Sequence, residues 1–238
     1  MKKPLIGIVT KYYRDESFYN WTNQEISNDL RYALCKNGAR VVGILPQCSL
    51  HYFQELDEHD TTSITDLEKE ELIELVDMCD GIVLQGGMYS SYYEEFIAKY
   101  CFEKGKPILG ICAGFNCMIR ALGGITKLLE DTSRHKRPDL KYAHKCNIVD
   151  KNSTFYNIVK KDNFEVNSIH TYIADTLPKQ LKIVAMSDDG QVEVIESKSD
   201  GFYLGIKYHP ELLFEEDKIQ NDIFVSFIEK CREEQEKK

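Results

Sequence analysis

A cysteine between two glycines is the first position in this chain that could do chemistry. Gly110-Ile111-Cys112-Ala113-Gly114 lies between an apolar run typical of a buried strand and one typical of a helix. A nucleophile in such a strand–turn–helix needs small neighbours, because the chain folds tightly there. The turn would direct the sulfur over the carboxyl edge of a sheet, and the helix N-terminus would favour thiolate over thiol. The motif alone also fits a buried cysteine packed in a strand–helix turn.

A thiol nucleophile needs a base, and His209 has the most suitable setting among the six histidines. His209-Pro210-Glu211 follows an apolar run over 203–208 that predicts a strand, and the proline ends it. Glu211 could hydrogen-bond the imidazole and orient it, which would complete a set of nucleophile, base and orienting residue. By itself, the tripeptide also fits a loop histidine beside a solvated glutamate.

The elements that would position these residues alternate in the first half of the chain. Patterns typical of capping boxes at Thr22–Glu25 and Thr65–Glu68 predict two helix starts, and Lys104-Gly105 predicts a helix end. Further strands are expected near 141–149, 164–169, 181–186, 191–196 and 203–208, then a final helix, with a loop over 47–64. The first-half strands are predicted at 5–9, 41–45, 81–84 and 107–111. This order favours an α/β doubly wound sheet in one domain, 1–238, with a frayed tail over 233–238.

The composition of the chain argues against some classes of function. The chain has 238 residues, 42% of them hydrophobic, which suffices for one sizeable core. Its net charge of -9 argues against a protein that binds nucleic-acid phosphates. No apolar run reaches the roughly 18–20 residues of a membrane span. The eight cysteines include no C-x-x-C pair and no export signal precedes them, so we expect a cytoplasmic protein with reduced thiols and no metal.

Three motifs together carry a resemblance to a known family. Gly86-Gly87 at a strand end, the turn around Cys112 and the His209-Pro210-Glu211 tripeptide occur in the order found in class I glutamine amidotransferases. The chain resembles that family over about residues 4–230. Within it, the chain is most similar to the γ-glutamyl-γ-aminobutyrate hydrolase (peptidase C26) branch, on the residues Pro4–Ile8, Lys106–Cys112, Ala121–Gly124, Val166–His170 and Asp189–Glu196.

The resemblance implies a flavodoxin-like fold, a mostly parallel sheet with helices on both faces. It implies Cys112 as nucleophile, His209 as general base and acid, and Glu211 as the residue that orients the imidazole. It also implies an oxyanion hole formed by Gly86, Gly87 and Ala113, and no cofactor.

The chain departs from the family where substrate contacts are expected. The family usually has an aspartate two residues beyond the Gly-Gly pair and then a proline, where this chain reads Met88-Tyr89-Ser90. Ala113 stands where many members have arginine, and Thr171-Tyr172 replaces a His-Gln pair. The resemblance places substrate contacts at Met88, Asn167, Ser168 and His170. His170 fits equally well as a polar residue after a strand.

We therefore expect a hydrolase that cleaves a γ-glutamyl amide bond of a small substrate, or of glutamine, through a thioester on Cys112. One alternative is a glutaminase that delivers ammonia to a separate synthetase, because too few residues remain here for a synthetase domain. Another is a non-catalytic protein that binds γ-glutamyl compounds or amino acids. Nucleic-acid and membrane partners are not expected. The leaving amine, the pathway and the oligomeric state stay open.

Overall fold

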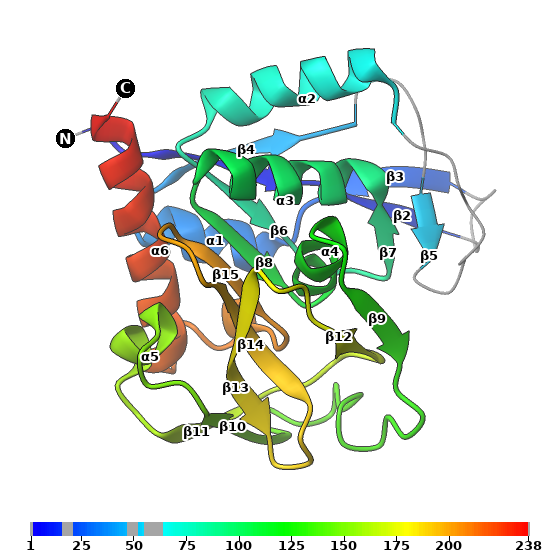
Figure 1. Ribbon diagram of the computed structural model, residues 1–238, viewed down its shortest axis with the longest axis vertical. Coiled ribbons are helices and arrows are strands. Elements are labelled where there is room, and N and C mark those ends of the chain that lie inside the picture. Colours follow the sequence, from blue (N-terminus) through cyan, green and yellow to red (C-terminus); the bar gives the residue numbers. More distant parts are fainter. Residues whose placement is uncertain (1, 16–20, 47–51, 55–63, 238) are drawn as a thin grey trace.

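A nine-stranded sheet forms the centre of the protein (Figure 1). The computed structural model describes residues 2–15, 21–46, 52–54 and 64–237. The spatial order of the strands is β11-β10-β13-β14-β15-β8-β6-β1-β4. In chain order they are β1 (Leu5–Val9), β4 (Arg40–Ile44), β6 (Gly81–Leu84), β8 (Ile108–Ile111), β10 (His144–Ile148), β11 (Asn163–Val166), β13 (Leu181–Ser187), β14 (Val192–Ser197) and β15 (Tyr203–Ile206).

The sheet has a parallel half and an antiparallel half. The strands β15, β8, β6, β1 and β4 run parallel to one another. On the other side of β15, the strands β14, β13, β10 and β11 are all joined by antiparallel pairing. The nine strands expected from the sequence are confirmed, with ends that differ by a few residues. β15 is the strand at which the two halves meet.

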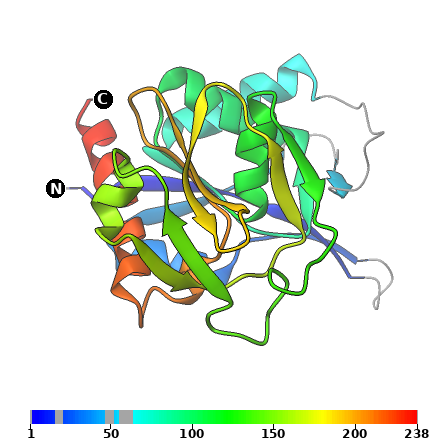
Figure 2. The same ribbon diagram turned by 60° about the horizontal axis from the view of Figure 1, so that its bottom comes forward.

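Helices cover both faces of the sheet, as expected (Figures 1 and 2). One hydrophobic cluster packs α1 (Asn28–Lys36), α5 (Thr154–Val159) and α6 (Lys218–Glu236) against one face. The other cluster packs α2 (Asp66–Met78), α3 (Tyr92–Lys104) and α4 (Ala113–Ala121) against the opposite face. Successive side chains of a strand alternate between the clusters: Ile108 belongs to the second and Leu109 to the first.

One predicted helix start is confirmed and the other is wrong. Thr65 and Glu68 form a reciprocal capping box, in which the Thr65 N–H donates to Glu68 Oε2 at 2.6 Å. Residues 21–25 instead form β3 (Trp21–Glu25), which pairs with β2 (Lys11–Asp15) in an antiparallel hairpin. α1 starts only after Ser27, whose hydroxyl accepts from the Leu30 N–H. The residues that match a capping box are also compatible with a strand. Here residues 21–25 pair with β2 and do not start a helix.

Short strands at the periphery were not expected. β5 (Tyr52–Gln54) pairs with β7 (Tyr89–Ser91), so the predicted loop over 47–64 is wrong at 52–54, while 47–51 and 55–63 lie outside the described residues. β9 (Ile125–Leu128) pairs with β12 (Tyr172–Thr176). The helix α6 continues to Glu236, and the fraying expected from residue 233 stays a prediction. Helical hydrogen bonding extends the amphipathic face that holds Cys231 in the core.

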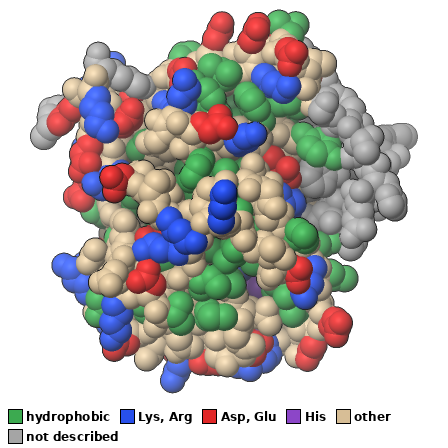
Figure 3. All heavy atoms as spheres, viewed as in Figure 1, with side chains coloured by type: hydrophobic (Ala, Val, Ile, Leu, Met, Phe, Trp, Pro, Cys, Tyr) green, Lys and Arg blue, Asp and Glu red, His purple; other side chains and the backbone are tan. Residues whose placement is uncertain are grey.

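Charges of both signs are interspersed on the face shown in Figure 3. Of the helices that the structure describes, none is both long and apolar enough to cross a bilayer.

Candidate active site

Cys112 occupies the turn between β8 and α4, in a backbone conformation that L-residues seldom adopt. Its φ is 52° and its ψ is -102°, so the turn is strained. The flanking glycines are required by close packing. A Cβ on Gly110 would lie 2.3 Å from Met118 Sδ, and a Cβ on Gly114 would lie 2.1 Å from the Leu84 carbonyl oxygen. The sequence therefore permits this turn only with glycine at both positions.

His209 reaches the same edge of the sheet from the neighbouring strand. β15 pairs in parallel with β8, and the Cys112 N–H donates to the Ile206 carbonyl at 2.8 Å. His209 Nδ1 lies 2.7 Å from Glu211 Oε1, and a side-chain hydrogen bond joins the imidazole to the Cys112 sulfur. The structure thus brings together the three residues that the sequence predicts as nucleophile, base and orienting group.

Asn167 fixes the backbone of His209 from both sides. Its Oδ1 accepts from the His209 N–H at 2.8 Å, and its Nδ2 donates to the His209 carbonyl at 2.7 Å. Both polar groups of this buried amide are therefore used within the protein. Asn167 does not line the cavity at Cys112 described below, and the expected substrate contact at this residue stays a prediction.

Charge on the neighbours governs the protonation of His209. Burial by itself would lower the pKa of the imidazole, but the charges of Glu211 and Cys112 and the hydrogen bonds to both residues outweigh it. The pKa of His209 is held well above its ordinary value as a result. A protonated imidazole beside the sulfur favours a thiolate, the reactive form of cysteine.

A cavity of about 380 Å³ opens at the Cys112 sulfur. Among the predicted site residues, Gly87, Met88, Cys112, Ala113 and His170 line it. Gly86 lies behind the reacting groups, since a Cβ there would be 2.6 Å from His209 Cε1.

Ser168 is fully buried and does not line this cavity; its hydroxyl lies 3.4 Å from His135 Nδ1. The expected substrate contact at Ser168 likewise stays a prediction. The packing of the segment after β11 turns Asn167 and Ser168 inward and leaves Ile169, His170 and Thr171 on the cavity wall.

Two lysines of the cavity were missed by the sequence interpretation. Lys207 follows β15 and is buried, and its ammonium donates to Asn116 Oδ1 at 2.7 Å. A lysine at the end of an apolar run was a usable signal for it. Lys136 reaches the wall through a bridge to Ile169, a long-range pairing with no local signal in the sequence.

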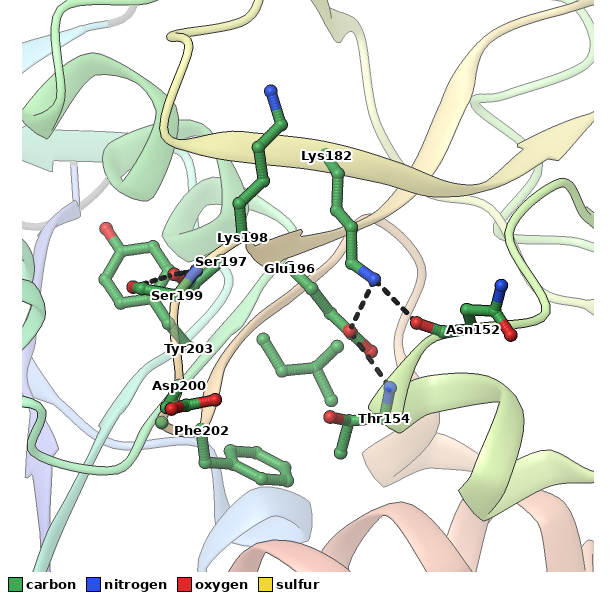
Figure 4. A pocket seen from close by; sticks show the side chains of 12 residues that line it. Asn152, Thr154, Lys182, Glu196, Ser197, Lys198, Ser199, Asp200, Phe202 and Tyr203 are labelled. Carbon is green, nitrogen blue, oxygen red and sulfur yellow. Dashed lines mark hydrogen bonds and ion pairs between the residues drawn. The ribbon is translucent and has the colours of Figure 1, made fainter.

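A second hollow of about 210 Å³ lies at the opposite end of β15 (Figure 4). Its polar groups form hydrogen bonds that stabilise the fold. Lys182 Nζ donates to the Asn152 carbonyl at 2.9 Å, and the Glu196 carboxylate accepts from the Thr154 and Phe155 N–H groups at the start of α5. This hollow is remote from Cys112. Tyr203, at the start of β15, lines the hollow, whereas His209 follows the other end of that strand.

Known proteins share this arrangement of elements. The Peptidase C26 family model matches residues 91–211, just over half of the chain. The chain belongs to the Peptidase C26 family. The match begins at the end of β7 and ends at Glu211, so it includes both Cys112 and His209.

Relatives of this peptidase C26 protein are named as a putative glutamine amidotransferase or as glutamine-hydrolysing GMP synthases. A Schizosaccharomyces pombe protein named as a putative glutamine amidotransferase is 30% identical over 180 residues, which cover 64% of this chain and 70% of that protein. The glutamine-hydrolysing GMP synthase of Thermosipho africanus is 30% identical over 133 residues, 55% of this chain and 24% of the synthase. That of Clostridium botulinum is 31% identical over 169 residues, 69% of this chain and 30% of the synthase. The chain thus spans less than a third of these GMP synthases.

Two solved structures show the same fold. A Thermoplasma acidophilum protein named as a putative GMP synthase component superposes with a TM-score of 0.65 at 19% identity, over 98% of this chain and 96% of that one. The glutaminase domain of Trypanosoma brucei CTPS with bound acivicin superposes with a TM-score of 0.67 at 17% identity, over 97% and 94%. The flavodoxin-like fold of class I glutamine amidotransferases is confirmed. This peptidase C26 protein is a glutamine amidotransferase-like hydrolase of carbon–nitrogen bonds.

Proposed function

We propose that this protein hydrolyses the γ-glutamyl amide bond of a small substrate through a γ-glutamyl thioester on Cys112. One observation carries the proposal: a strained cysteine, hydrogen-bonded to an imidazole that a buried glutamate holds, opens into a cavity of about 380 Å³. Cavities of this size suit small molecules rather than polypeptides.

The geometry supports a two-step acyl transfer. Because Nδ1 of His209 faces Glu211, Nε2 is the nitrogen available to the thiol. Cys112 would transfer its proton there and attack the γ-carbonyl carbon, and backbone N–H groups of Gly87 and Ala113 would stabilise the oxyanion. When the carbon–nitrogen bond breaks, His209 would return the proton to the leaving amine. The imidazole would next remove a proton from water, which hydrolyses the thioester and releases a glutamyl carboxylate.

The charge of the cavity favours an acidic acyl group. Lys136 and Lys207 line it, and a glutamyl substrate brings an α-carboxylate that a cation would bind. The exposed Met88 lies at the same wall and offers an apolar contact to the leaving amine.

The direct test measures amine release from a panel of γ-glutamyl amides that includes glutamine. Wild type and Cys35→Ala, which removes a partly buried thiol of α1, should be active. Cys112→Ala should lose activity by about 10³-fold or more, because the covalent route is removed. Equal activity in wild type and Cys112→Ala would overturn the proposal.

A second candidate function is supported by the GMP synthase relatives: hydrolysis of glutamine with delivery of ammonia to a separate synthetase. Glutamine hydrolysis that is absent from the isolated chain, and that appears in a complex with a synthetase recovered from the source cell, would favour this function.

Acivicin separates both enzymatic functions from simple binding, since it is the compound bound to the related Trypanosoma brucei domain. A catalytic Cys112 should become covalently modified, whereas a folded protein that stays unmodified would favour the binding-only alternative.

A further inference from the structure

Four buried side chains converge on one point beside the cavity: His135, His144, His170 and Glu193. The exposed fraction of each residue is between 0% and 7%. One ligand atom from each lies within 4.8 Å of the others. They come from four segments, the turn after β9, the strand β10, the segment after β11 and the strand β14. The sequence spacing is irregular, and sequence analysis predicted no metal.

Hydrogen bonds at the far side of each ring assign the tautomers. Nδ1 of His144 lies 3.2 Å from the Lys145 carbonyl oxygen, and Nδ1 of His170 lies 3.1 Å from the Tyr172 carbonyl oxygen. Because carbonyls only accept, both Nδ1 atoms carry the proton. A neutral imidazole with its proton on Nδ1 has a lone pair on Nε2, and neither Nε2 atom has a hydrogen-bond partner within the described part of the chain.

The third ring is oriented by a carboxylate. Nε2 of His135 lies 3.0 Å from Asp189 Oδ2, so Nε2 donates and Nδ1 holds the lone pair. Ser187 and His135 together hold this aspartate in place. A histidine whose outer nitrogen donates to a carboxylate or a backbone carbonyl is the usual arrangement of metal-binding histidines. All three rings have it.

The three lone pairs face one carboxylate oxygen. Glu193 Oε1 lies 3.9 Å from His135 Nδ1, 3.6 Å from His144 Nε2 and 4.0 Å from His170 Nε2. Within the described part of the chain, neither Glu193 oxygen accepts a hydrogen bond.

Two neighbouring groups could donate to the cluster. The Ser168 hydroxyl lies 3.4 Å from His135 Nδ1, and the Lys207 ammonium donates to Asn116. Neither gives a hydrogen bond to the Glu193 carboxylate. His144 Nε2, His170 Nε2 and both Glu193 oxygens are thus buried without a hydrogen-bond donor among the described residues, and a cation at their centre would remove the cost of burying them.

We propose that His135, His144, His170 and Glu193 bind one divalent transition-metal ion, with Zn²⁺ the best match to three imidazoles and a carboxylate. Zinc bonds to these atoms of about 2.0–2.2 Å in a tetrahedron separate the ligand atoms by roughly 3.3–3.5 Å. The observed separations of 3.6–4.0 Å from Glu193 Oε1 would contract by about 0.1–0.7 Å, and the widest separation in the cluster, up to 4.8 Å, by more than about 1 Å, when the side chains close on the ion.

Four protein ligands close the coordination shell, as in structural zinc sites. The ion would join β10 and β14 to the segments that carry Lys136, Ile169 and His170, which form one wall of the cavity. Its role would be to hold that wall, and this assignment does not depend on the proposed reaction.

The test is metal binding to the whole chain after removal of bound ions with a chelator. Wild type should bind one Zn²⁺ per chain in competition with a chromophoric chelator, and Co²⁺ should give the visible absorption bands of a four-coordinate site. Glu193→Gln should abolish tight binding. Asp189→Asn should weaken it by about 10- to 100-fold, because it removes the carboxylate that orients His135.

Cys112→Ala is the matched control, because a reactive thiol with a neighbouring histidine could itself bind zinc. This variant should bind like wild type. Asp189 is partly exposed, so Asp189→Asn answers the question even if Glu193→Gln does not fold, as judged by circular dichroism. A folded wild type that binds neither Zn²⁺ nor Co²⁺ would overturn the proposal. So would binding that Cys112→Ala abolishes and Glu193→Gln retains.

Discussion

Replacing Asn167 by alanine should slow catalysis without weakening substrate binding. The amide touches neither the cavity nor the Cys112 sulfur, yet it holds the N–H and the carbonyl of His209. Its removal leaves two buried backbone groups of the catalytic base without partners, and the imidazole then has more than one orientation available. Asn167 is therefore a positioning residue.

The size of the effect follows from the two bonds. A hydrogen bond in a protein contributes a net 0.5–1.5 kcal/mol, roughly, so two contribute about 1–3 kcal/mol. If all of this appears in the barrier, kcat falls by about 5- to 150-fold at 25 °C. KM should change little, because the residues that line the cavity remain.

The assay is steady-state hydrolysis of the best γ-glutamyl amide, together with the rate of Cys112 labelling by acivicin. Asn147→Ala is the matched control, since that amide also donates two hydrogen bonds, to Met186 and Asp188, but does not contact His209. An unchanged kcat in Asn167→Ala, or an equal loss in Asn147→Ala, would refute the reasoning.

Further predictions concern the same edge of the sheet. Gly86→Ala should lower kcat by about tenfold or more, because its Cβ would lie 2.6 Å from His209 Cε1, whereas a Cβ on Gly87 would lie 3.0 Å from Lys11 Cγ and should cost less. Steady-state kinetics on the pair checks this, and a larger loss at Gly87 would contradict it. Glu211→Gln should lower the pKa of His209. A histidine whose pKa is raised on folding stabilises the folded state. This stabilisation is complete at pH values below the unfolded pKa of about 6.5, and it is lost as the pH rises through the folded pKa. The difference in unfolding free energy between wild type and Glu211→Gln should thus shrink as the pH rises above about 6.5 in denaturant titrations; growth with pH would contradict the assignment. Iodoacetamide should alkylate Cys112 before the four fully buried thiols whose pKa burial raises, as peptide mapping would show; the reverse order would be inconsistent with this site.

The reacting groups could be predicted from the sequence because each has a local signal. The glycines on either side of Cys112 form a short motif in the sequence, and a Cβ at either position would lie 2.3 Å from Met118 Sδ or 2.1 Å from the Leu84 carbonyl oxygen. His209 and Glu211 are two residues apart, so one short segment contains the ion pair. Local patterns of this kind can be recognised in the sequence without knowledge of the fold.

What the sequence could not predict depends on distant pairing. Asn167 and His209 are 42 residues apart, so nothing near Asn167 indicates that its amide serves the base. The four-residue cluster around Glu193 likewise gathers four segments without a regular spacing. The wrong helix start at Thr22 has a different origin, because a competing local hairpin with β2 overrides the capping-box pattern.

The ladder between β8 and β15 also determines when conformational entropy is lost. The Cys112 N–H is bonded to Ile206, both backbone polar groups of His209 are bonded to Asn167, and the imidazole is bonded to Glu211 and Cys112, so few torsions of the two residues remain free. Ordering of the reacting groups therefore accompanies folding and is not deferred to substrate binding. A ligand that enters the cavity loses its own freedom but finds the sulfur and the imidazole already immobilised, and for this reason even a small acyl group can bind in a reactive geometry.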